Sequence, residues 1–320
     1  RLELTSDIGY RLTGRREPPL AFSLQAKDSL EEESVLVCRR RGIYELGELR
    51  LTIRDILDLA GFEKRIRTPI ALKVYPRVIP ISTFRIIASQ QMGHLRVKDP
   101  LFQDYAELSD LRRYREGDPV RRIHWKASAR RDNLMVKEFE ERGDTEVFLL
   151  LDSCREHYRG DPENWVADQL VDAAASVVDY CLKRNIMVTL QYDRPGSCQR
   201  FQGDTPAYLK HFLEGLARFQ ATETQPYAHQ ISAGTSRLAP GTALLLLTPM
   251  LDRKLAAQVL QLKMSYLHPN LLVFGDAVNM PVPWNQNREI GKKLFLEGVP
   301  FYLFDRRDSI RDVLEGSRDG

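Results

Sequence analysis

One local constellation in this sequence has the residue types of nucleophilic catalysis. Cys154 and His157 lie three residues apart, with Asp152 beside them. A cysteine becomes a nucleophile when an imidazole takes up its proton, and a carboxylate can orient that imidazole. Spacing alone does not place the imidazole on the thiol, and no glycine-rich phosphate loop accompanies these residues. We therefore predict that the protein is not an enzyme.

A second set of special residues is basic. The segment from Arg112 to Arg131 holds eight Lys or Arg and only two acids, together with a Gly-Asp-Pro turn, a tryptophan and a histidine. Three interpretations fit it. Its arginines could brace a domain junction through bidentate bonds to carboxylates, or dock an acidic protein partner, or hold nucleic-acid phosphates beside a stacking ring. The net charge of the whole chain, only +3, counts against the third.

Length and composition limit the class of protein. A chain of 320 residues suits two domains, each large enough to bury its own core. With 43% hydrophobic and 28% charged residues, it is globular rather than disordered or fibrous. The four cysteines show no zinc-site or disulfide spacing, so free thiols in a reducing compartment are expected. No run approaches the ~20 apolar residues that cross a bilayer, so this chain is expected to be soluble by itself. Because it begins at Arg1 without a methionine, we expect it to be a fragment of a longer protein.

From about Leu20 to Tyr75 the pattern is short and β-like. Apolar and polar residues alternate around positions 22–26, 35–37, 49–53 and 72–74. Arg41-Gly42, Leu46-Gly47 and the prolines at 69 and 76 are typical of turns between such runs. The pattern predicts an antiparallel, immunoglobulin-like β-sandwich over residues 1–80. Residues 54–62 are the exception, since a helical turn ending at Gly61 and a structured loop fit equally well.

From Thr145 onward, apolar strands alternate with amphipathic helices, which predicts a mostly parallel sheet covered by helices over residues 145–320. The expected strands are 146–151, 186–192, 243–248, 271–274 and 300–304. The expected helices are 164–184, 207–219, 252–262 and 308–314. Residues 221–241 are interpreted as a long connection. Residues 81–144, which contain the basic segment, would connect the two domains.

Ligands of open α/β sheets bind at the carboxyl ends of strands, which directs attention to the residues after Leu151. A strand ending in Asp-x-Ser-x-Ser resembles the start of the von Willebrand factor A metal site, and this sequence has Asp152, Cys154 and Glu156 at those three places. The resemblance would extend to Thr205 and Asp252 on later loops. Mg²⁺ and Mn²⁺ prefer oxygen ligands, so a thiol makes such a site degenerate. Alternatively, Asp152 caps the following segment or pairs with a basic residue.

The two halves together resemble the bacterial domain-of-unknown-function 58 family. The resemblance rests on RRRGIYELG at 39–47, VYPRV at 74–78, YREGDPVRRIHWKASAR at 114–130 and KEFEE at 137–141, followed by a degenerate A-type domain. The positions that carry the long motif are Tyr114, Gly117, Asp118, Arg121, Ile123, His124, Trp125, Lys126, Ser128, Ala129 and Arg130. All of these except Ile123 and Ala129 are predicted as interaction residues. The resemblance implies a MoxR-type AAA+ ATPase as partner and two transmembrane helices upstream of residue 1. It also implies that this part lies on the cytoplasmic face of the bacterial membrane.

These observations predict a non-enzymatic, membrane-anchored interaction protein. An N-terminal β-sandwich and a basic connecting segment would precede a Rossmann-like von Willebrand factor A-type domain, which presents its strand-end rim to a partner. The alternative is a binder of nucleic acid or another anionic polymer through the basic segment from Arg112 to Arg131.

Overall fold

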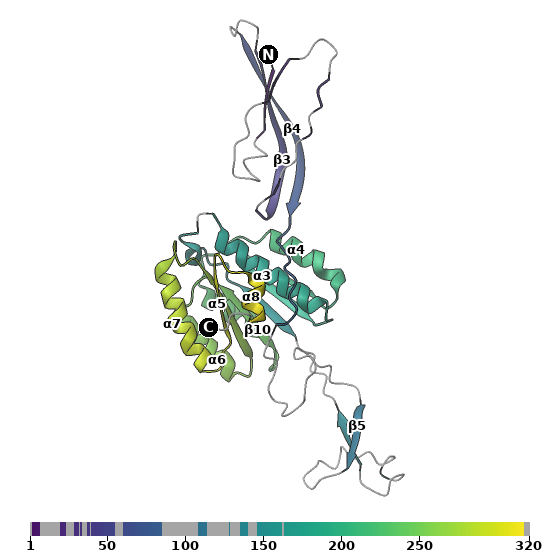
Figure 1. The fold of residues 1–320 in the computed structure, drawn as a ribbon, viewed down its shortest axis with the longest axis vertical. Helices are drawn as coiled ribbons and strands as arrows, with labels where there is room; N and C mark the ends of the chain where they lie inside the picture. The colour runs from purple at the N-terminus through teal and green to yellow at the C-terminus, as the bar shows by residue number, and fades with distance from the viewer. Residues whose placement is uncertain are drawn as a thin grey trace.

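The structure is a computed structural model, and it describes residues 2–6, 20–23, 29–31, 33, 37–38, 40–54, 60–84, 108–113, 128, 135–139, 146–161 and 163–316. Three sheets lie within these residues (Figure 1): a four-stranded sheet near the N-terminus, a two-stranded sheet, and a six-stranded sheet covered by helices. None of the described helices is both long enough and apolar enough to cross a membrane.

The six-stranded sheet is the core of the C-terminal half. Its order is β12-β11-β10-β7-β8-β9, which is the doubly wound order with its switch point between β7 and β10. The strands are β7 (Val147–Leu151), β8 (Val188–Arg194), β9 (Ser197–Gly203), β10 (Ala243–Thr248), β11 (His268–Gly275) and β12 (Phe301–Asp305). All pairings are parallel except that of β8 with β9. The continuous apolar runs of β7 and β10 are buried along their whole length, as expected for strands covered on both faces.

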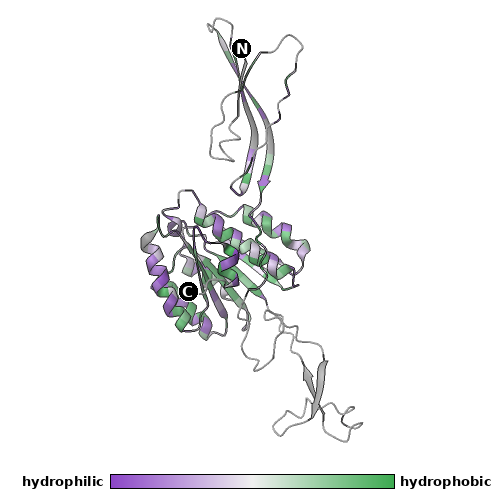
Figure 2. Ribbon diagram, viewed as in Figure 1, coloured by the Kyte–Doolittle hydropathy of each residue, from purple (hydrophilic) through white to green (hydrophobic). Residues whose placement is uncertain are grey.

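Helices cover both faces of this sheet. One face carries α3 (Trp165–Leu182), α4 (Leu209–Ala217) and α8 (Ile310–Glu315), and the other carries α5 (Tyr227–Thr235), α6 (Arg253–Met264) and α7 (Pro281–Leu296). Two separate apolar clusters result, because alternate residues of β7 point to opposite faces. Val147, Leu149 and Leu151 pack toward α3, while Phe148 and Leu150 pack toward α5 and α6. Figure 2 shows the apolar strands of this sheet lying among helices that carry both polar and apolar residues.

The helix α3 is buried along nearly all of its length because the chain leaving the N-terminal sheet crosses its outer side. The backbone N–H of Arg77 donates to Asp172 (2.9 Å) and that of Ile79 donates to the Ser176 hydroxyl (2.9 Å). Phe84, 1% exposed, packs into the same apolar cluster as the helix. The buried polar residues of α3 therefore hold the two halves of the chain together.

The N-terminal sheet has the order β2-β1-β3-β4, with every pairing antiparallel. Its strands are β1 (Leu2–Ser6), β2 (Leu20–Phe22), β3 (Gly42–Arg54) and β4 (Gly61–Val74). The long β3–β4 hairpin projects from the helical part of the molecule (Figure 1), and Phe62 is 61% exposed on it. The antiparallel strands agree with the prediction, but the described residues form one sheet, and a packed sandwich is not confirmed.

Two turns predicted in this sheet are wrong, because the residues lie inside strands. Pro69 lies within β4. Leu46 and Gly47 do not separate two strands; they lie within β3, where the pairing register shifts between Leu46 and Glu48 as in a β-bulge. Of the two alternatives for residues 54–62, a helical turn ending at Gly61 is not found, because Gly61 begins β4 opposite Arg54. Residues 55–59 lie outside the described residues.

The basic segment is bounded by a pair of strands. β5 (Leu108–Arg113) and β6 (Met135–Phe139) pair antiparallel, with Arg113 opposite Met135. In the sequence, the signature motif lies between these two paired strands.

The α/β prediction is confirmed in its main features, namely a sheet of mostly parallel strands with helices on both faces. The interpretation of residues 221–241 as a connection is wrong, because α5 lies within them. The edge strand β9 and the helix α7 were not expected from the sequence.

Candidate functional site

Asp152 lies at the carboxyl end of β7, is fully buried, and has both carboxylate oxygens engaged by the protein. Its Oδ1 accepts a hydrogen bond from the backbone N–H of Cys154 (2.9 Å). Its Oδ2 accepts from the Thr248 hydroxyl (2.6 Å) and lies 2.6 Å from Nδ1 of His157. Of the two alternatives predicted for this residue, a cap on the following segment or a basic partner, the second describes its contact with His157.

The imidazole of His157 is directed to this carboxylate rather than to the thiol of Cys154. Burial alone would lower the pKa of His157, but the hydrogen bond and the negative charge of Asp152 outweigh it, so the pKa lies above its usual value. The side chain is 20% exposed and its Asp152 partner is not exposed at all. His157 is therefore the cationic partner of a buried carboxylate when it is protonated.

The other predicted metal ligands do not converge on Asp152. Cys154 is buried, and burial raises the pKa of its thiol. Glu156 is exposed and pairs with Arg159 at 2.5 Å. Asp252 begins α6 at the same rim, where its carboxylate accepts from the backbone N–H of Leu255 (2.7 Å) as a helix cap.

Thr205 lies at the other end of the sheet. It follows β9, which runs antiparallel to β8, so that the last residue of β9, Gly203, pairs with Val188 at the amino end of β8. The described residues contain no group of three His, Cys, Asp or Glu side chains that could hold a metal ion. With the Asp152 oxygens already engaged, the side chains present at this rim do not fit a divalent cation.

Sequence reasoning missed two residues that complete this rim. Thr248 is the last residue of the buried strand β10, which lies next to β7, and the carboxyl-end rule would have found it. Glu223 lies on a loop that is hydrogen-bonded to the residues after Asp152. Its N–H donates to the carbonyl of Ser153 (3.0 Å), and its carbonyl accepts from the N–H of Arg155 (2.9 Å). No sequence signal marked this loop.

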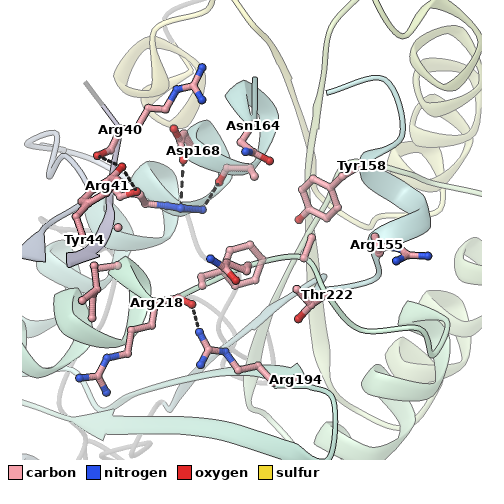
Figure 3. Close-up of a pocket in the computed structure, with 17 residues that line it drawn as sticks. Arg40, Arg41, Tyr44, Arg155, Tyr158, Asn164, Asp168, Arg194, Arg218 and Thr222 are labelled. Atoms are coloured by element: carbon pink, nitrogen blue, oxygen red, sulfur yellow. Dashed lines mark hydrogen bonds and ion pairs between the residues drawn. The ribbon is translucent and has the colours of Figure 1, made fainter. Parts of the chain in front are cut away.

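A recess of about 630 Å³ opens beside this rim, between the start of β3 and the carboxyl ends of β7 and β8 (Figure 3). We call it the arginine recess because five arginines and a single acid are among its lining residues. These are Arg40, Arg41, Arg155, Arg194, Arg218 and Asp168. Tyr158 joins it to the first site, since it lines the recess and its hydroxyl donates to the carbonyl of Asp152 (2.6 Å).

Arg41 is the most buried cation of the recess, with 8% of its side chain exposed. It pairs with Asp168 (3.1 Å), donates to the carbonyl of Ala167 (3.4 Å) and lies 5.6 Å from the ring centroid of Phe219. Its Nε is buried without a hydrogen-bond partner in the described part of the chain. Burial lowers the pKa of Arg41 despite the nearby carboxylates, and it raises the pKa of Asp168 to about 6 despite the arginine.

The other four arginines of the recess have few partners for their positive charge. Arg194 donates to the backbone carbonyl of Arg218. Arg40, Arg155 and Arg218 are exposed, and none makes an ion pair with a residue that the structure describes. The recess therefore concentrates positive charge at the carboxyl-end rim.

Most of the signature motif cannot be placed relative to these sites. Ser128 is described and buried, 9% exposed. The other predicted interaction residues lie outside the described residues: Tyr114, Gly117, Asp118, Arg121, His124, Trp125, Lys126 and Arg130. Their roles stay predictions.

Fold and rim together define a doubly wound α/β domain joined to an antiparallel sheet. Residues 110–194, which include both the signature motif and Asp152, match the family described as "Protein of unknown function DUF58". The family expected from the sequence is thereby confirmed over this segment.

Similar proteins are known in bacteria. The chain is 28% identical over 144 residues to "Uncharacterized protein YeaD" of Bacillus subtilis (strain 168), a match covering 45% of this chain and 34% of that protein. The chain thus spans about a third of the length of this curated relative.

Two solved structures are similar to the chain at low identity. One is an aerotolerance-related membrane protein from Bacteroides fragilis NCTC 9343, with 13% identity, a TM-score of 0.38, and coverage of 54% of this chain and 96% of that one. The other is the SpRpn10 VWA domain, with 11% identity, a TM-score of 0.32, and coverage of 54% and 92%.

Proposed function

We propose that this chain is a non-enzymatic protein-interaction module that receives its partner at the carboxyl-end rim of the six-stranded sheet. The observation that carries the proposal is that His157 bonds Asp152 rather than the thiol of Cys154. The imidazole bonds the carboxylate at 2.6 Å, and burial raises the pKa of the thiol. A thiol held in its protonated form is a poor nucleophile, so these groups support the fold rather than a reaction.

The rim offers positive charge to a partner. Arg155 and Arg218 are exposed there and make no ion pair with a described residue. Complementary charge speeds association and selects among partners, so an acidic protein surface is the natural complement.

The partner that the family resemblance implies is a MoxR-type AAA+ ATPase. We propose that this ATPase is the partner, and that helices upstream of residue 1 hold the chain at the cytoplasmic face of the membrane. A membrane-anchored module of this kind would bring the ATPase to the membrane through its rim.

Binding of the purified chain to a MoxR-type ATPase from the same organism tests the proposal. We expect a complex by size-exclusion chromatography, and we expect Arg155→Glu to weaken it. Arg237→Glu is the matched control, because Arg237 is also exposed but follows α5, at the opposite end of the sheet. No complex under any salt condition, or equal weakening by both variants, would refute docking at this rim.

The basic segment is tested separately by charge reversal at Arg121 and Lys126. If the variant stays folded and binds the ATPase normally, this segment is no part of the docking surface. The alternative function, binding of an anionic polymer, predicts nucleic-acid affinity that falls steeply with salt through counterion release, whereas a packed protein interface loses less.

A further inference from the structure

We propose that the arginine recess is a binding site for a small ligand that carries at least two phosphate groups. The site lies at the junction between the start of β3 and the rim of the α/β domain. The site shares Arg155 and Arg218 with the docking rim proposed above, but its ligand is a small molecule whose binding is measured without any protein partner.

The balance of charge in the recess is the first argument. Its lining residues include five guanidinium groups and one carboxylate, that of Asp168. Like charges brought together in a partly enclosed space repel one another, and the repulsion costs stability unless a counter-charge is present. A single monovalent anion would offset only part of this charge, whereas a ligand with two phosphates carries several negative charges.

The state of Arg41 is the second argument. Its side chain is almost wholly buried, its Nε lacks a hydrogen-bond partner among the described residues, and burial lowers its pKa. A buried cation is expected to be fully paired, because an uncompensated buried charge is costly. Its ion-pair partner is Asp168, and burial raises the pKa of that carboxyl to about 6. An anion in the recess would supply an acceptor for the Nε and further negative charge beside the guanidinium.

The kind of cation favours phosphate over carboxylate. Every basic residue that lines the recess is an arginine, whose planar fork of N–H donors matches phosphate and carboxylate oxygens in bidentate fashion. A carboxylate has two oxygens to accept these donors, whereas a phosphate has three terminal oxygens arranged around a tetrahedral centre and can face several arginines at once. The arginines belong to three separate segments, before β3, after β7 and after α4, and a ligand with several oxygens can bond more than one of them.

The remaining wall supplies uncharged contacts. Asn164 precedes α3 in the left-handed conformation (φ 55°), and its side chain makes no capping bond to the helix. Thr222 is exposed in the recess, and the Phe219 ring forms part of its wall. A volume of about 630 Å³ falls within the range of small-molecule sites, so a phosphorylated ligand with an attached organic group also fits.

The neighbouring helix end does not contribute the charge. The first backbone N–H groups of α3, those of Trp165, Val166 and Ala167, already donate to the carboxylate of Asp161. Phosphate recognition here therefore depends on the arginines, and substitution of arginines tests it directly.

The test is isothermal titration of sodium pyrophosphate into the whole chain at constant ionic strength. Inorganic phosphate, ADP and a hexaglutamate peptide form the comparison series. We expect saturable binding of pyrophosphate, tighter than that of phosphate. The double variant Arg155→Gln, Arg218→Gln should weaken it by roughly tenfold or more, since two charge-assisted contacts are removed. Both side chains are exposed, and thermal unfolding of the variant checks that the fold is kept.

Arg237→Gln is the matched control and should bind pyrophosphate like the unchanged chain. Tighter binding of ADP than of pyrophosphate would support the site with a nucleotide as its ligand; equal binding would support it with the bare diphosphate. Absence of saturable binding by both would overturn the proposal. So would equal weakening in the control, or tighter binding of hexaglutamate than of pyrophosphate. Because ATPase binding is measured without phosphate ligands, the two proposals can fail separately.

Discussion

Two polar regions adjoin each other at the carboxyl-end rim, and they differ in how far their charges are paired. Around Asp152, a backbone N–H, a hydroxyl and an imidazole meet the carboxylate within 2.6–2.9 Å. In the arginine recess, five arginines face one acid, and Arg41 is buried with an unpaired Nε in the described part of the chain. Tyr158 contacts both regions.

The difference separates a structural role from a binding role. A buried charge whose partners all lie within the protein supports the fold without needing a ligand. A cluster of like charges with too few partners costs stability, and such a cost is common where a ligand later binds. The sequence predicted a ligand at Asp152, whose charge is paired within the protein. The arginine recess beside it has the excess of charge.

The largest expected effect follows removal of the paired carboxylate. Asp152→Ala leaves the Thr248 hydroxyl, the Cys154 N–H and the His157 ring without their buried partner, so the free energy of unfolding should fall by about 3–5 kcal/mol. Urea denaturation measures it. The exposed Asp312→Ala is the control and should stay within about 0.5 kcal/mol of the unchanged chain. Equal stability of the two variants would remove the structural role from Asp152.

A smaller loss is expected when only the hydroxyl partner is removed. Thr248→Val deletes the 2.6 Å hydrogen bond to Oδ2 of Asp152 while keeping the shape of the side chain. The free energy of unfolding should fall by about 1–3 kcal/mol, because a buried acceptor loses a donor. In an Asp152→Ala background the same substitution should cost clearly less, since the two effects are coupled. Additive losses would show that the two residues act independently.

The third prediction concerns pH. The folded pKa of His157 is raised, so protonation is favoured in the folded state, and the stability gained is fully present below the unfolded pKa of about 6.5. This stability is lost as the pH rises through the folded pKa. The difference in unfolding free energy between the unchanged chain and His157→Gln should therefore be larger at pH 6 than at pH 8.5. A difference that does not change with pH would contradict the ion pair.

The smallest expected effect concerns ligand binding in the arginine recess. Asp168→Asn removes the one carboxylate among the lining residues of the recess, so pyrophosphate should bind more tightly. A gain of about 1 kcal/mol, roughly fivefold in affinity, is expected for loss of one partly exposed charge. Calorimetric titration of the variant beside Asp312→Asn measures it. Weaker binding by Asp168→Asn would mean that this carboxylate orients Arg41 for the ligand rather than competing with it.

The parts of the fold that were predictable are those with strong apolar periodicity. β10 has the predicted bounds, and α3 differs from its prediction by one or two residues at each end. β9 was missed because it is a polar edge strand, largely exposed. α5 was missed because its apolar signal is weak, with only Tyr227 and Ile231 as large buried apolar residues.

The two regions of the site also differ in how far the sequence predicted them. Asp152 was found because the rule that ligands bind at the carboxyl ends of strands needs only the strand. Thr205 was misplaced because β9 reverses direction, which the sequence did not indicate. The arginine recess has no sequence pattern: Arg41 and Ala167, 126 residues apart, meet only when the N-terminal sheet lies against α3.

One pair of calorimetric titrations tests the central contrast most directly: Mg²⁺ in one run and pyrophosphate in another, each with the unchanged chain and with Arg155→Gln, Arg218→Gln. The contrast predicts saturable binding of pyrophosphate that the double variant weakens, and no saturable binding of Mg²⁺. Saturable Mg²⁺ binding that is lost in Asp152→Asn, without any binding of pyrophosphate, would contradict it and return the ligand site to the end of β7.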